Sequence, residues 1–147
     1  MIVLLKSLLT GFVTAASFAF IYRVPQKQVL RCGLIGAAGL FVFALTGYLG
    51  QVAAYFLAAT LVALLSEITA RMAREPVIVF LIPGVIPLVP GGMAYTTMLS
   101  FLQNDYPGGF EQLAVMLFAA GAIAGGITVT SSAFRALYRP RRGHAAD

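Results

Sequence analysis

The sequence predicts an all-α, polytopic membrane protein with five transmembrane helices, the fourth broken by a segment rich in proline and glycine. Three observations lead to this fold class. The 147 residues are 60% hydrophobic and only 10% charged, with a mean hydropathy of +0.91, whereas soluble domains carry about 25% charged residues. The apolar residues form long runs, each near the ~20 residues that a helix needs to cross a bilayer. Lys and Arg residues are confined almost entirely to alternate loops.

The apolar runs define the predicted elements. We expect spans at residues 2–22, 32–49, 52–70, 77–102 and 111–134, followed by a basic tail at 135–147, all within one integral membrane domain, 1–147. The first run could be mistaken for a secretory signal, but it is too long and lacks a convincing small-residue cleavage site. The polar stretches 23–31 and 103–109 contain proline or glycine and are expected to be turns.

The basic residues predict the orientation of the chain. The second and fourth loops contain no Lys or Arg, and the fourth carries Asp105 and Glu111 instead. By the positive-inside rule the C-terminus is expected in the cytoplasm and the N-terminus outside, which requires an odd number of spans. Only Lys6 lies on the unfavoured side. Because the bases flank apolar runs, they indicate topology and not a nucleic-acid partner. The basic residues that follow this pattern are Arg23, Lys27 and Arg31 in the first loop, Arg71 and Arg74 in the third, and Arg135, Arg139, Arg141 and Arg142 in the tail.

The fourth span contains the most unusual segment. Residues 82–92 include three prolines and three glycines. Each proline in a helix interior costs roughly 3 kcal/mol and frees a backbone carbonyl. Irregular backbone at membrane depth is tolerated only where protein covers it or where it lines a cavity, so broken helices point to transport sites. The alternative is a proline kink without a ligand. A straight helix over 77–102 would be about 39 Å long, more than the ~30 Å core needs, and a break near the midplane would absorb the excess.

A second half-helix is expected to start near Gly91 or Gly92. Its first amides would be unpaired and would carry the positive end of the helix dipole, which suits a carboxylate. Tyr95, Thr96 and Thr97 could supply hydroxyl groups beside it, although threonines in membrane helices often bond to their own backbone.

Glu67 is the one carboxylate in the interior of a predicted span, since Glu111 stands at the very start of the fifth. An ionisable residue at membrane depth is a candidate for proton coupling. However, Arg71 follows four residues later on the same helix face, so the pair could simply be an ion pair that ends the helix.

Small residues predict close helix contacts. Gly33, Gly36 and Gly39 follow one another at three-residue steps, and Gly121 and Gly125 form a GxxxG motif, a spacing that favours helix packing. Enzyme motifs are absent, and the single cysteine and the single histidine, Cys32 and His144, cannot form a disulfide or a catalytic triad. We therefore expect neither an enzyme nor a bound metal or cofactor.

The proline-rich segment also carries a resemblance. Ile82–Pro83 and the run from Ile86 to Met98 resemble the signature of the threonine/serine exporter family, and in particular its small, five-span (YjjB-like) subunit. The stretches 18–25 and 30–32 resemble the first linker of that subunit. The resemblance implies secondary export of small carboxylate-bearing metabolites, either threonine and serine or dicarboxylates such as succinate. It also implies a bacterial inner membrane and a separate, larger membrane subunit. The positions that match the signature are implied as pathway residues: Pro87, Pro90, Gly91 and Tyr95.

Two other functions stay open at this point. A scaffold subunit could use the proline break only to shape a helix interface, and a channel would give flux without saturation. The substrate, the coupling ion and self-association into a homo-oligomer are not determined by the sequence.

Overall fold

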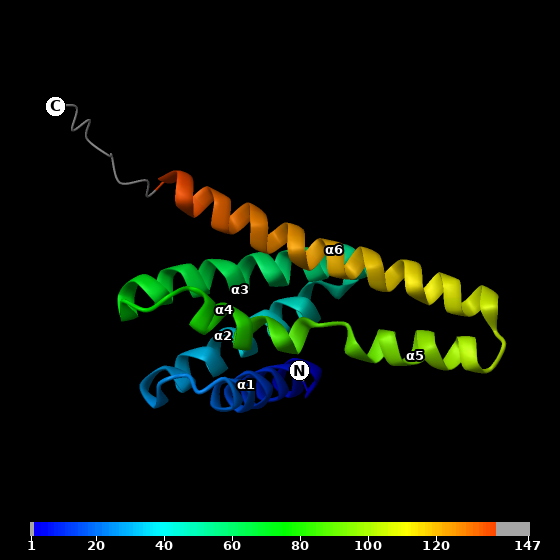
Figure 1. Cartoon of the computed structure of the whole chain (residues 1–147), viewed down its shortest axis with the longest axis horizontal. Coiled ribbons are helices and arrows are strands. Elements are labelled where there is room, and N and C mark those ends of the chain that lie inside the picture. The colour runs from blue at the N-terminus through cyan, green and yellow to red at the C-terminus, as the bar shows by residue number, and fades with distance from the viewer. Residues whose placement is uncertain (1, 138–147) are drawn as a thin grey trace.

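The computed structural model describes residues 2–137, which form helices joined by short turns (Figure 1). The predicted tail beyond residue 137, with His144, lies outside the described residues. The elements in chain order are α1 (Ile2–Ile21), α2 (Gln26–Thr46), the 3-10 turn η1 (Gly47–Leu49), α3 (Gln51–Ala73), α4 (Ile78–Val85), the 3-10 turn η2 (Ile86–Leu88), α5 (Gly91–Leu102) and α6 (Tyr106–Leu137).

These helices confirm the predicted fold class. α1, α2, α3 and α6 are each long and apolar enough to cross a membrane. The α4–η2 segment and α5 pass the same test together as a pair bent by 45°. The described residues therefore contain four candidate spans, or five when the bent pair counts as one, and the fourth in chain order is the broken one.

Two helices begin earlier than the predicted spans, in stretches that were expected to be turns. α2 begins at Gln26 because Pro25 occupies the N-cap position and the residues after it are good helix formers. α6 begins at Tyr106, with Pro107 in its first turn, where the missing amide proton is not needed. The turns are correspondingly shorter. α6 has 32 residues and a length of about 48 Å, so it must tilt or extend beyond a ~30 Å hydrocarbon core.

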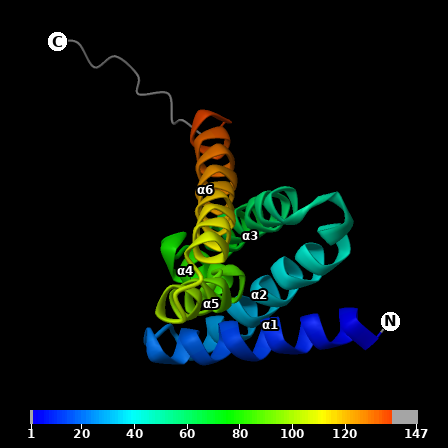
Figure 2. The ribbon, with the colours of Figure 1, turned by 90° about the vertical axis from the view of Figure 1, so that its right-hand side faces the viewer.

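The helices form a bundle and an arm. α1 to α4 pack together, with α2 in contact with α1, α3 and α4, while α6 packs along α3. α5 packs on α6, and the two extend side by side beyond the bundle (Figure 1). Figure 2 shows α1 running crosswise to α6. We call α5 together with the part of α6 that packs on it the arm. The break in the fourth span thus separates α4, which packs in the bundle, from α5, which lies in the arm.

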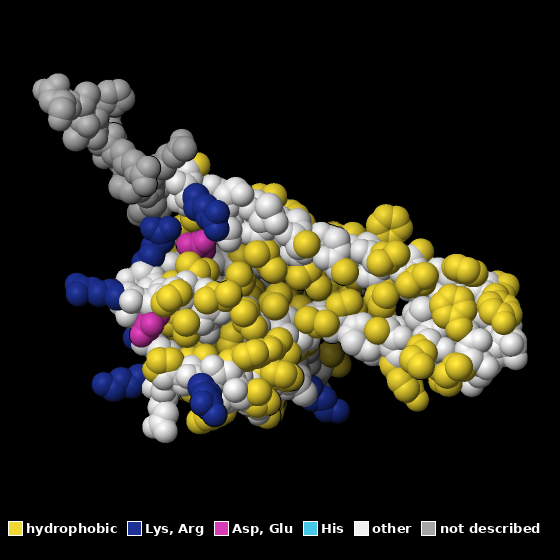
Figure 3. Space-filling view, viewed as in Figure 1, with side chains coloured by type: hydrophobic (Ala, Val, Ile, Leu, Met, Phe, Trp, Pro, Cys, Tyr) yellow, Lys and Arg dark blue, Asp and Glu magenta, His cyan; other side chains and the backbone are white. Residues whose placement is uncertain are grey.

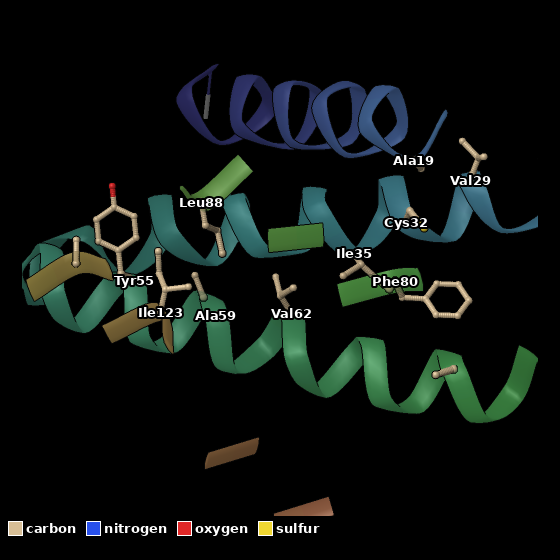
Figure 4. Close-up of a cluster of buried hydrophobic side chains, with 13 residues drawn as sticks. Ala19, Val29, Cys32, Ile35, Tyr55, Ala59, Val62, Phe80, Leu88 and Ile123 are labelled. Carbon is tan, nitrogen blue, oxygen red and sulfur yellow. The ribbon is translucent and has the colours of Figure 1, made fainter. Parts of the chain in front are cut away.

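The bundle core lies where α2, α3 and α4 meet (Figure 4). Cys32, Val62 and Phe80 are fully buried there. The centroids of the Phe43 and Tyr55 rings lie 4.5 Å apart, and this contact joins the last turn of α2 to the start of α3. The first half of the broken span is therefore anchored by ordinary apolar packing.

Small residues bring the helices of the bundle together. A methyl group added at Gly36 would lie 2.9 Å from the carbonyl oxygen of Gly11 on α1 and would also meet Ala15. One added at Gly39 would lie 2.5 Å from Val62 on α3. The predicted packing role of these α2 glycines is confirmed.

The GxxxG pair of α6 does not form the closest crossing among the described residues. A methyl group at Gly121 would meet nothing within 4 Å, and one at Gly125 would make only ordinary contact with Phe56. The close crossing lies at Gly126 instead, where an added methyl group would stand 2.7 Å from the carbonyl oxygen of Phe56 and 2.9 Å from the hydroxyl of Thr60.

Most of the charged side chains visible in Figure 3 lie at one end of the bundle. The turn between α1 and α2, the turn between α3 and α4, and the end of α6 lie at that end (Figure 1). The arm is apolar over much of its surface, with exposed Tyr95, Met98, Phe110 and Phe118 among its residues. This separation agrees with the charge pattern of the sequence, and the N-out orientation remains a prediction.

Candidate functional site

The fourth span breaks over residues 86–90. α4 contains Pro83 and ends at Val85, and η2 follows with Pro87 in its first turn. Val89 is extended, with φ −62° and ψ 127°, because the ring of the following proline disfavours the helical conformation at the preceding residue. Pro90, with φ −75° and ψ 52°, is the N-cap of α5. The bend of 45° between the two halves follows from these local constraints.

The start of α5 exposes free backbone donors. The Gly91 amide donates to the carbonyl of Val89 at 2.7 Å, and the Ala94 amide donates to Pro90 at 3.1 Å. The amides of Gly92 and Met93 have no acceptor among residues 2–137, and no side chain caps the helix. Methyl groups added at Gly91 or Gly92 would meet nothing within 4 Å. The half-helix begins where the sequence predicted, and its positive end faces open space.

The hydroxyl residues of α5 differ in accessibility. Tyr95 is 68% exposed, whereas Thr97 is buried. The hydroxyls of Thr96 and Thr97 both donate to the carbonyl of Met93, at 3.1 and 2.7 Å. This back-bonding is the alternative that the sequence left open for the threonines. A hydroxyl that donates in this way can still accept a hydrogen bond.

The structure divides the predicted pathway residues between two neighbourhoods. Pro87 is half-buried against α2, where its ring lies 3.4 Å from the position of a methyl group added at Gly36. Thr96 instead lines a pocket of about 290 Å³ between the arm and the start of α3. Its walls are formed by six residues: Gln51, Met93, Thr96, Glu111, Gln112 and Val115.

Three polar residues of this pocket were not predicted from the sequence as site residues: Gln51, Glu111 and Gln112. The available signal was weak: Glu111 and Gln112 are adjacent polar residues at the start of a predicted span. Their approach to α5 depends on how α6 folds back along it.

A larger, apolar groove of about 850 Å³ adjoins the pocket, because Gln51 lines both. It lies between the start of α3 and the middle of α6, and its walls include Phe56, Leu117 and Phe118. The smaller pocket, which contains Thr96, therefore lies beside a larger apolar groove with room for a metabolite or a neighbouring helix.

Glu67 lies apart from the pocket. It is buried on α3, and its carboxylate oxygen Oε2 is 3.5 Å from Nη2 of Arg71. The Arg71 guanidinium also stacks 5.1 Å from the centre of the Phe134 ring on α6. This arrangement ties the ends of α3 and α6 together and matches the structural alternative for the pair. Among residues 2–137, no group of three His, Cys, Asp or Glu side chains could hold a metal ion.

Known proteins similar to this chain identify its family. The model of the family described as "Threonine/Serine exporter, ThrE" matches residues 7–133. A protein of Corynebacterium glutamicum named threonine/serine exporter is 33% identical over 136 residues, which cover 92% of this chain but only 28% of that relative. No solved structure matches the chain. The chain is therefore a multi-pass membrane protein that belongs to the threonine/serine exporter family, a family of transporters and not of enzymes.

Proposed function

We propose that this chain is the small subunit of a two-component secondary exporter in the bacterial inner (plasma) membrane. Its cargo would be a small carboxylate-bearing metabolite: threonine or serine, or a dicarboxylate such as succinate. The observation that carries the proposal is the pair of unbonded amides at Gly92 and Met93, which face open space at the break of a membrane span. The matched region covers about 28% of the length of the Corynebacterium glutamicum exporter. We propose the larger membrane subunit from the resemblance of residues 82–98 to the small, YjjB-like subunit of the family.

In this mechanism the two amides donate hydrogen bonds to the substrate carboxylate. The dipole of α5 adds to the attraction, and Gly91 and Gly92 allow the ligand to approach the backbone. The bundle holds α4 by buried Phe80, while α5 belongs to the arm. Movement of the arm relative to the bundle would carry the site from one side of the membrane to the other, as in carriers that alternate access around broken helices.

A scaffold role is the second candidate, and one observation favours it. Gly84 packs tightly in the core, where an added methyl group would lie 2.8 Å from Ile35 and 3.2 Å from Val62. The proline-rich segment thus shapes a helix interface in addition to freeing amides.

Efflux of radiolabelled threonine and succinate from cells separates the two candidates. The chain is expressed with and without a larger subunit of the same family, at matched membrane abundance. Gly91→Leu and Gly92→Leu should abolish partner-dependent efflux by covering the amides. Gly47→Leu is the matched control, because its side chain also enters open space. Unchanged efflux in both site variants would reject the site and favour the scaffold, and efflux that never saturates with substrate would indicate a channel.

A further inference from the structure

A groove lies between α2 and α3 at the charged end of the bundle. Its volume is about 220 Å³, and its walls are formed by six residues: Arg31, Leu34, Ile35, Leu65, Thr69 and Met72. Leu34 and Met72 are exposed, so the groove is open on the outside of the bundle. Because α2 and α3 are both long and apolar enough to cross a membrane, this open side is accessible to lipid.

The groove has a cationic end and an apolar end. Arg31 is in the second turn of α2 and Met72 is in the last turn of α3, so both lie toward the turns that carry the charged side chains. Leu65 lies further along α3, away from those turns. Arg31 is the one charged residue among the six walls. A molecule with an anionic head and an apolar chain has the same order of groups.

The charge of Arg31 is not neutralised by the described part of the chain. Its Nη1 donates to Oε1 of Gln28 at 3.0 Å, which orients the guanidinium and leaves its other N–H groups available. Lys27 precedes Arg31 by four residues on the same helix face, a spacing at which like charges repel. Neither base forms an ion pair with another residue of 2–137. An anion held between them would relieve the repulsion.

Thr69 adds a free hydroxyl to the groove. The hydroxyls of Thr46, Thr97 and Thr130 donate to the carbonyl four residues earlier, as threonines in helices commonly do. The hydroxyl of Thr69 is half-buried and makes no hydrogen bond within residues 2–137. It can therefore donate to an ester or phosphate oxygen of a ligand.

From this arrangement we infer that the groove between α2 and α3 binds an anionic phospholipid, with the phosphate at Arg31 and Lys27 and part of one acyl chain against the apolar walls. An arginine can donate two parallel N–H bonds to a phosphate. The groove holds several methylene groups and not a whole lipid, so the rest of the molecule stays in the bilayer. The inference goes beyond the proposed function, because it does not depend on transport.

Native mass spectrometry of the full chain in a neutral detergent tests the cationic end of the groove. The probes are phosphatidylglycerol, phosphatidylcholine with the same acyl chains, and glycerol 3-phosphate, which has no chains. We expect the wild type to bind phosphatidylglycerol more tightly than phosphatidylcholine. Arg31→Gln and Lys27→Gln should each weaken phosphatidylglycerol binding about fivefold, the effect of one base near an anionic headgroup. Arg135→Gln is the matched control, because it removes the same charge near the same end, on α6 and outside the groove.

The apolar end is tested by filling it. Thr69→Phe places a ring in the groove and should weaken phosphatidylglycerol binding. Ile68→Phe is its control, because Ile68 is the adjacent residue, is exposed and does not form a wall of the groove. Circular dichroism verifies that each variant is folded. The two ends are tested separately, so failure of one variant to fold leaves the other pair decisive.

Three outcomes would overturn the inference. Equal affinity of the wild type for the two lipids would exclude recognition of the anionic head. Equal losses in Arg31→Gln and Arg135→Gln would indicate diffuse attraction by the basic end and not a site in the groove. Glycerol 3-phosphate binding as tight as that of phosphatidylglycerol would assign the site to a soluble phosphate ester. Since efflux is not measured, these results are independent of the proposed function.

Discussion

The crossing of α3 and α6 offers the sharpest quantitative test of the structure. Gly121→Ala and Gly126→Ala place the same methyl group on the same helix, five residues apart. At Gly126 it would meet the Phe56 carbonyl oxygen at 2.7 Å and the Thr60 amide nitrogen at 3.1 Å, both of which are backbone atoms that cannot turn away. At Gly121 it would meet nothing within 4 Å.

The expected magnitudes follow from two terms. Replacing glycine by alanine inside a helix favours the helix by about 1 kcal/mol in both variants. Overpacking typically costs about 1–3 kcal/mol and applies only at Gly126. The free energy of unfolding of Gly126→Ala should therefore lie about 1–3 kcal/mol below that of Gly121→Ala. For a chain of this size the difference corresponds to roughly 2–12 °C in the unfolding midpoint.

Cys32 provides the assay. It is the single cysteine of the chain and is fully buried, so a thiol-reactive fluorophore labels it only when the bundle opens. Both variants are heated in the same detergent with the fluorophore, and their midpoints are compared. Equal midpoints, or a higher midpoint for Gly126→Ala, would refute the crossing at Gly126 and reopen the GxxxG interpretation of α6.

Three further predictions use the same protein. Phe80→Ala should lower the free energy of unfolding by about 3–5 kcal/mol, because removal of a fully buried ring leaves a cavity. Phe20→Ala is the control: its side chain is 62% exposed, so the change should be less than about 0.5 kcal/mol. The Cys32 labelling assay measures both. Glu67→Gln should cost less than about 1 kcal/mol, as expected for an i,i+4 pair, and should leave the pH profile of efflux unchanged; a displaced profile would favour proton coupling instead. In a Cys32→Ala background, Gly91→Cys should react with a polar thiol reagent in intact membranes, and threonine should slow the reaction in the complex; equal rates with and without threonine would count against the site.

The break of the fourth span was predictable because its causes are local. A proline ring removes an amide proton and restricts the residue before it, whatever surrounds the chain. The extended Val89 and the helix start at Gly91 follow from the sequence of Pro90 and the glycines after it. The free amides could be anticipated for the same reason, since the first amides of any helix lack a partner within it.

The pocket that Thr96 shares with α3 and α6 could not be predicted in this way. Thr96 lies on α5, whereas Glu111 and Gln112 lie on α6, so no helical spacing relates them. They line the same pocket only because α6 returns along α5 after a short turn. From the sequence, Glu111 appeared only as a charge at the end of a loop. The splitting of the predicted residues, with Pro87 against α2 and Thr96 in the arm, likewise depends on which neighbours each half-helix meets.

The sequence by itself determined the apolar spans and the position of the break, since these depend on composition and on the conformations open to each residue. The similarity of its residues 7–133 to an exporter family determined its membership of that family. Only the tertiary structure decided which glycine of α6 meets α3 and which residues of α3 and α6 line a pocket with Thr96 of α5. The physical reason is that a spacing of small or polar residues marks one face of a helix, while the identity of the helix opposite that face is set by long-range packing.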